Sequence, residues 1–132
     1  MRSPITTQAI VVLAITGTSL AGCASKEAAT SAPIDGNPAA EVTVAANENE
    51  CKVSATQGFT GANTFNITNN GNKVTEFYVY GEGERVMGEV ENISPGLSRK
   101  LIVQLTEPGT YQTACKPGMV GDGIRGDFTV TG

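Results

Sequence analysis

The segment YQTACKPGM, residues 111–119, decides how the rest of the chain is interpreted. It places Cys115 at the end of a predicted strand and Met119 four residues later, in a loop that contains proline and glycine. A thiolate and a thioether at this spacing are two of the ligands of a type-1 copper site, which also needs two imidazoles. Because the chain contains no histidine, the segment indicates the architecture of a copper protein without its electron-transfer centre.

Short runs of β-branched and aromatic residues with period two surround this segment, separated by glycine, asparagine and proline. Residues 74–80 form the clearest predicted strand, with Glu76, Tyr78 and Tyr80 on one face. Residues 85–93 alternate again, which predicts that Met87, Glu89 and Glu91 share a face. Seven to eight such strands, at intervals of about ten residues and without an amphipathic helix, predict an all-β, Greek-key β-sandwich.

The N-terminal part carries the pattern of an export signal. Arg2 precedes a short apolar core at residues 9–15, too short to span a bilayer. The sequence LAGC at residues 20–23 matches a bacterial lipobox, which predicts cleavage after residue 22 and lipid on Cys23; the alternative is an ordinary signal peptide with a free Cys23. Residues 23–40 are rich in Ala, Ser and Pro and are interpreted as a flexible tether, which leaves residues 41–132 as one domain at the extracytoplasmic face of the membrane.

Composition excludes several classes of function. Without Arg2 the chain has 8 basic and 13 acidic residues, a net charge of −5. Nucleic acid is therefore not an expected partner, because phosphate binding needs clustered Lys and Arg. The chain has no histidine as a general base, no Cys-x-x-Cys and no G-x-S-x-G, so we do not expect an enzyme.

Two longer segments carry a family resemblance. Residues 75–99 contain the motif ENISPG, and residues 109–126 contain the motif PGTYQTAC except for its first residue, Pro108. Both segments resemble the cupredoxin-like domain of the EfeO family. Members of that family are extracytoplasmic components of a bacterial elemental-iron uptake system. The resemblance covers nearly all of residues 41–132 and implies a stand-alone cupredoxin-like module. It also implies metal handling, with an iron permease or other uptake components as partners.

Cys51 and Cys115 remain once Cys23 is assigned to the lipid, and the EfeO resemblance brings these two together in the fold. An even pair in an exported protein predicts a disulfide. The alternative is that one or both are thiolate ligands of a metal. In a copper site, Cys115 and Met119 would be the soft ligands, whereas Met119 without a metal is an apolar residue that fills a Gly-rich loop.

Acidic residues offer a different metal site. Glu76 matches a glutamate that the resemblance implicates in metal binding, and Tyr78 and Tyr80 share its face. Glu89 and Glu91 lie about 7 Å apart on one face of a strand. Carboxylate and phenolate oxygens are hard donors that suit ferric iron. The alternative is that these glutamates form only the solvated side of a sheet.

Two functions are consistent with these features. The first is a membrane-tethered metal-binding accessory protein that captures iron, or binds copper in support of iron oxidation, and passes metal to a permease. The second is a metal-free sandwich, stapled by its disulfide, that acts as a protein-protein docking module of an uptake complex.

Overall fold

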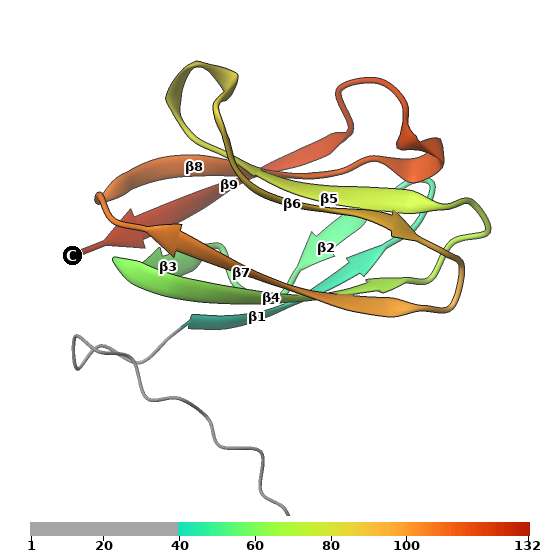
Figure 1. The fold of residues 1–132 in the computed structure, drawn as a ribbon, viewed down its shortest axis with the longest axis horizontal. Helices are drawn as coiled ribbons and strands as arrows, with labels where there is room; N and C mark the ends of the chain where they lie inside the picture. Colours follow the sequence, from blue (N-terminus) through green and yellow to red (C-terminus); the bar gives the residue numbers. More distant parts are fainter. Residues whose placement is uncertain (1–39) are drawn as a thin grey trace, which may run out of the picture.

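The computed structural model describes residues 40–132, which form two β-sheets packed face to face (Figure 1). One sheet has the strand order β2-β1-β4-β7 and the other β3-β9-β8-β5-β6. The expected all-β sandwich is confirmed. The strands are β1 (Ala40–Ala46), β2 (Cys51–Val53), β3 (Gln57–Phe59), β4 (Gly61–Asn69), β5 (Thr75–Tyr80), β6 (Val86–Ile93), β7 (Ser98–Leu105), β8 (Gly109–Cys115) and β9 (Ile124–Thr131).

Strand pairing is mostly antiparallel. Two pairs are parallel, β1 with β4 and β3 with β9, and in each the chain passes through the other sheet between the paired strands. Strands β2 and β3 have only three residues each, too few to show a period of two. This is why the sequence predicts seven or eight strands, whereas residues 40–132 contain nine.

The core lies between the sheets and is centred on Phe65, whose ring is 5.3 Å from that of Phe77 and 5.2 Å from that of Phe128. Alternation along β1, β4, β5, β7 and β9 supplies most of the other fully buried apolar side chains, as period two predicts, and Ile93 of β6 and Cys115 of β8 complete the core. Both sheets and this core lie within residues 40–132. That segment therefore has what an independent folding unit needs.

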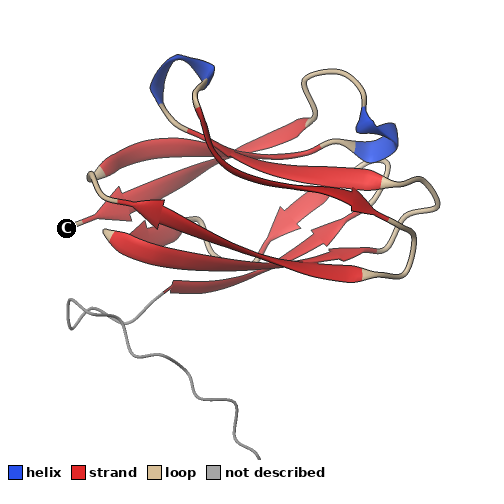
Figure 2. Ribbon diagram, in the orientation of Figure 1, coloured by secondary structure: helices blue, strands red, loops and turns tan. Residues whose placement is uncertain are grey.

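Helical structure in residues 40–132 is limited to two 3-10 turns, η1 (Glu82–Glu84) and η2 (Pro117–Met119), seen at the outer side of the five-stranded sheet (Figure 2). Turn η1 lies in the β5–β6 connection and η2 in the β8–β9 connection. No helix in this part of the chain has the length and apolar character to cross a bilayer.

Strand β6 departs from the expected alternation. Its register with β5 shifts twice, once near Met87 and once near Asn92, which has a φ of 56°. Each shift is a β-bulge, in which one extra residue in β6 makes the side chains after it point to the opposite face of the sheet from the one that strict alternation predicts. Met87 therefore packs against the core instead of sharing the outer face with Glu89 and Glu91, and its predicted position was wrong.

Gly58 in β3 leads to a stability prediction. A β-carbon there would overlap Asn63 Oδ1 and lie 2.7 Å from the Phe128 ring. Asn63 is fully buried, and its Nδ2 donates to Phe59 O and Gly61 O, so it has little freedom to move. We expect Gly58→Ala to lower the free energy of unfolding by about 2 kcal/mol through overpacking, measured by urea denaturation.

The matched control is Gly126→Ala in β9, where the new β-carbon would meet Thr113 Oγ1 at an ordinary 3.7 Å. Its free energy of unfolding should stay close to that of the wild type. Equal stability of the Gly58 and Gly126 variants would contradict the packing around Asn63.

Candidate metal centre

The outer face of the five-stranded sheet carries a small second cluster of buried residues. Tyr78 and Tyr80 of β5 stack with ring centroids 5.4 Å apart and nearly parallel planes, and Ala114 of β8 completes the cluster. Glu76, on the same face of β5, is only 9% exposed. The sequence prediction that Glu76, Tyr78 and Tyr80 share a face is thus confirmed.

The hydroxyl of Tyr78 lies between two carboxylates. Its Oη is 3.2 Å from Glu76 Oε2 and 3.2 Å from Glu91 Oε1. Glu89 is the cross-strand partner of Tyr78 on β6. A phenol has one proton and an ionised carboxylate only accepts, so Tyr78 donates to one glutamate at a time. The other contact then brings two acceptor oxygens together.

Burial and negative charge perturb Tyr78. Loss of solvent raises the pKa of its phenol, and the charge of Glu76 and the hydrogen bond to it raise the pKa further. Glu89 and Glu91 act in the same direction with smaller effects. At neutral pH Tyr78 is therefore a neutral hydrogen-bond donor among three glutamates.

The raised pKa predicts how stability changes at alkaline pH. Below about pH 10 the phenol is protonated in both the folded and the unfolded chain. Above that pH the unfolded chain loses the proton first, so the folded state loses stability as pH rises. We therefore expect the free energy of unfolding, measured with urea, to fall more between neutral and alkaline pH in the wild type than in Tyr78→Phe. Parallel losses in both proteins would contradict this pKa shift.

Two cations cover the tyrosine rings. Lys116 Nζ lies 4.3 Å from the ring centroid of Tyr78 and 5.8 Å from that of Tyr80. The guanidinium carbon of Arg125 lies 4.8 Å from the Tyr80 ring. Such cation–π contacts stabilise by about 0.5–1 kcal/mol at exposed sites. The side chains of Lys116 and Arg125 therefore cover the rings of Tyr78 and Tyr80 and shield them from water.

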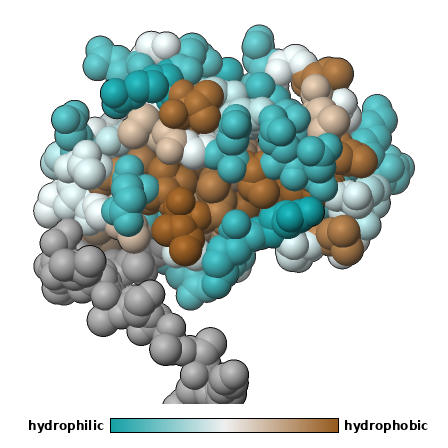
Figure 3. Space-filling model, in the orientation of Figure 1, coloured by the Kyte–Doolittle hydropathy of each residue, from teal (hydrophilic) through white to brown (hydrophobic). Residues whose placement is uncertain are grey.

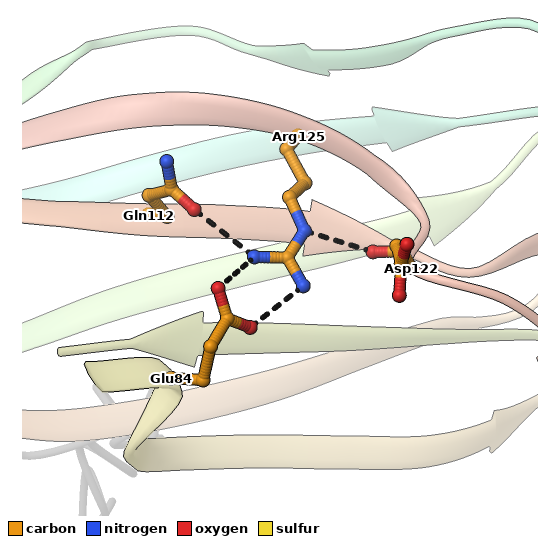
Figure 4. A network of polar contacts seen from close by, with 4 residues as sticks. All are labelled: Glu84, Gln112, Asp122 and Arg125. Atoms are coloured by element: carbon orange, nitrogen blue, oxygen red, sulfur yellow. Dashed lines mark hydrogen bonds and ion pairs between the residues drawn. The ribbon is translucent and has the colours of Figure 1, made fainter. Parts of the chain in front are cut away.

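Arg125 also joins three segments (Figure 4). Its Nη1 and Nη2 each donate at 2.9 Å to a different oxygen of Glu84 in η1, Nη1 donates to Gln112 Oε1, and Nε donates to Asp122 O. Hydrogen bonds from Arg125 lower the pKa of Glu84, and Glu84 raises the pKa of Arg125. Because Glu84 is exposed, this pair contributes positioning of the β5–β6 connection more than stability.

Cys51 and Cys115 form a disulfide with their Cα atoms 5.5 Å apart. The predicted pairing is thus present in the structure, and neither sulfur is a thiolate while the bond is intact. Cys115 is fully buried against the inner core. Its cross-strand partner is Phe77, which faces the core, whereas Glu76 faces outward. The sulfur atoms and the carboxylates therefore lie on opposite faces of the five-stranded sheet.

Met119 ends η2 with a φ of 57° and is 42% exposed, so it does not fill the loop as a buried plug. A type-1 copper site needs a cysteine thiolate and two imidazoles. Cys115 Sγ is bonded to Cys51, and the chain has no histidine. The donor set present does not fit this copper centre.

The structure brings Glu76, Glu89 and Glu91 to one face and adds Tyr78 as their shared neighbour. In residues 40–132, no three side chains of His, Cys, Asp or Glu gather as a preformed metal-binding group. Sequence reasoning did not identify Lys116 or Arg125. Period two, continued one residue beyond β8 for Lys116 and along β9 for Arg125, could have placed them outward, but only the strand register sets them over the tyrosines. Cys23, the signal peptide 1–22 and the tether up to residue 39 lie outside the described residues.

Comparisons with known proteins agree with this architecture. A family model described as a cupredoxin-like domain matches residues 10–130. No curated protein sequence matches the chain.

Among solved structures, reduced auracyanin from the photosynthetic bacterium Roseiflexus castenholzii is similar with a TM-score of 0.58 and 18% identity, over 71% of this chain and 98% of its own. Auracyanin B gives a TM-score of 0.57 and 17% identity, over 77% of this chain and 96% of its own. An azurin from Methylomonas sp. strain J gives a TM-score of 0.52 and 14% identity, over 70% of this chain and 98% of its own. At these identities the likeness concerns the fold.

Proposed function

The chain belongs to the cupredoxin-like domain family, and from this premise we propose that it is a lipid-anchored, extracytoplasmic metal-binding accessory protein of bacterial iron uptake. The supporting observation is the group of oxygen atoms on the outer face, where Glu76 and Glu91 each lie 3.2 Å from Tyr78 Oη. Carboxylate and phenolate oxygens are hard donors, which favour a hard cation such as Fe(III). Iron is the cargo of such a protein.

Electrostatics supports a cation at this position. One phenol proton cannot satisfy two carboxylates, and Glu89 adds a third negative charge on the same face. A unit positive charge about 4 Å from one carboxylate gains about 4 kcal/mol at the effective dielectric constant of a protein surface, before desolvation and screening. A cation bound between these oxygens therefore replaces acceptor repulsion with attraction.

The alternative metal is copper, bound by soft sulfur ligands in support of iron oxidation. It requires the thiolates of Cys51 and Cys115 together with Met119. The disulfide occupies both thiolates in the oxidised protein. The oxygen group on the outer face thus makes iron the preferred metal.

The proposed location follows from the LAGC sequence before Cys23. Lipid on Cys23 would keep the domain at the extracytoplasmic face of the membrane. From there it would deliver iron to a permease or to another component of the uptake system, in line with the EfeO resemblance of residues 75–99.

Metal titration tests the proposal. Metal-free protein comprising residues 40–132 is titrated with Fe(III) supplied as a weak chelate, and separately with Cu(II) and Zn(II). We expect one equivalent of Fe(III) to bind more tightly than Cu(II) or Zn(II). Absence of Fe(III) binding below about 1 mM, a free energy weaker than about 4 kcal/mol, would contradict the proposed function.

The disulfide favours a second candidate, a metal-free docking module of an uptake complex. Its bond between Cys51 and Cys115 staples the two sheets without any metal. This candidate predicts that metal titration shows no binding and that Glu76→Gln leaves complex formation with the uptake components unchanged.

A further inference from the structure

Strands β6 and β7 end the two sheets on the same side of the sandwich (Figure 1). Within residues 40–132, neither strand has a second neighbour in its sheet. They are joined by the turn at residues 94–97, and Gly88 of β6 lies against the Val103 side chain of β7. We call this surface the β6–β7 edge. It leaves the outer backbone groups of both strands available for pairing.

The β6–β7 edge exposes apolar side chains. Val86 is 47% exposed and, opposite Tyr80, points to the outer face of the five-stranded sheet. Ile102 is 60% exposed and, opposite Thr64, points to the outer face of the four-stranded sheet. Between these two faces, Met87, Val90 and Leu101 pack on the core and are partly exposed at the edge. Figure 3 shows a band of hydrophobic residues across the middle of this side, with hydrophilic residues above and below it. Contiguous apolar surface with a polar rim is typical of an interaction site.

Charge on the β6–β7 edge is divided between its two strands. β6 carries Glu89 and Glu91, and β7 carries Arg99 and Lys100, all exposed. Glu91 also contacts Tyr78 Oη through its Oε1, so in the metal-free protein its carboxylate lies at the border between the outer face and this edge. Because Gly88 is level with Val103 and the strands run in opposite directions, Glu91 is approximately level with Lys100. The edge therefore has an acidic strand and a basic strand with charges at the same height.

This division is self-complementary. In an interface with two-fold symmetry, residue i of one copy meets residue j of the other, and j meets i. A two-fold axis parallel to these strands places β6 of one copy opposite β7 of the other. Glu91 of each copy then faces Lys100 of its partner, and the apolar band lies between the two ion pairs.

We propose that the β6–β7 edge is a self-association surface that binds a second copy of this chain about such an axis. The two bulges leave Gly88–Val90 as the regular part of β6, with Glu91 at the start of the second bulge, whereas β7 pairs regularly with β4 from Ser98 to Leu105. Backbone pairing across the interface is thus short. The association belongs to the small, reversible class of interfaces.

Sedimentation equilibrium of metal-free protein comprising residues 40–132 tests the proposal. We expect the apparent mass to approach that of a dimer at about 100 µM, since small interfaces are weak. Ile102→Lys should remain monomeric over the same range. Val120→Lys is the matched control, because Val120 is an exposed apolar residue on the β8–β9 connection, and it should associate like the wild type.

A charge exchange tests the geometry. Glu91→Lys alone and Lys100→Glu alone should each be monomeric, because like charges meet twice in each symmetric dimer. An equimolar mixture of the two variants should associate, and so should the double variant E91K/K100E. Circular dichroism melting curves show that the variants are folded. A monomeric wild type, association that survives Ile102→Lys, or a mixture that fails to associate would each overturn the proposal.

Discussion

Reduction of the Cys51–Cys115 disulfide lowers the free energy of unfolding by about 4 kcal/mol, the value that loop-closure entropy assigns to a crosslink of this span. The two cysteines are 64 residues apart in sequence. The bond joins β2, at the edge of one sheet, to β8, in the middle of the other. A loss of this size is a large part of the stability of a domain of this length.

Urea unfolding with and without a dithiol reductant measures this loss. The double variant C51A/C115A is the control, because reductant should not change its unfolding. Unchanged unfolding of the wild type, under conditions where thiol counting shows both cysteines to be reduced, would contradict a stabilising disulfide. Fe(III) affinity should be the same in both redox states, since the oxygen group lies on the opposite face of the sheet from Cys115.

Replacement of Glu76 and Glu91 by Gln is expected to weaken Fe(III) binding by about 100-fold or more, equivalent to at least about 2.7 kcal/mol. The amides keep the shape of the side chains but remove two negative charges from the oxygens beside Tyr78. Competition against a chelator of known affinity measures the change.

The control for this prediction is E50Q/E107Q, which removes the same charge from exposed positions outside the outer-face group. Its Fe(III) affinity should stay within a few-fold of the wild type, because exposed charges at a distance are screened. Equal weakening in the two double variants would show that only net charge matters and would remove Glu76 and Glu91 from the site.

Alternation of side chains predicted the sandwich because period two holds wherever one face of a strand packs on the core. Phe65 and Ile67, and later Phe77 and Val79, point inward as expected. The prediction failed where alternation is broken or too short to see. The bulge near Met87 moves that residue into the core, and β2 spans only Cys51–Val53.

The candidate site was predictable only in part. Counting cysteines predicted the Cys51–Cys115 bond, and period two placed Glu76 beside Tyr78. Nothing in the sequence shows that Glu76 pairs across strands with Lys116, the neighbour of Cys115. That register sets the glutamate outward and the cysteine inward, so the sulfur and carboxylate donors expected in one metal site are separated by the sheet.

Absorption spectroscopy during Fe(III) titration tests the central claim most directly, namely that the oxygen group around Tyr78 binds a hard cation. Metal binding displaces ligand protons, so Tyr78 can become a phenolate ligand in spite of its raised pKa. The account predicts a visible tyrosinate-to-iron charge-transfer band that saturates at one equivalent and is lost in Tyr78→Phe. An absent band, or a band that persists in Tyr78→Phe, would contradict it.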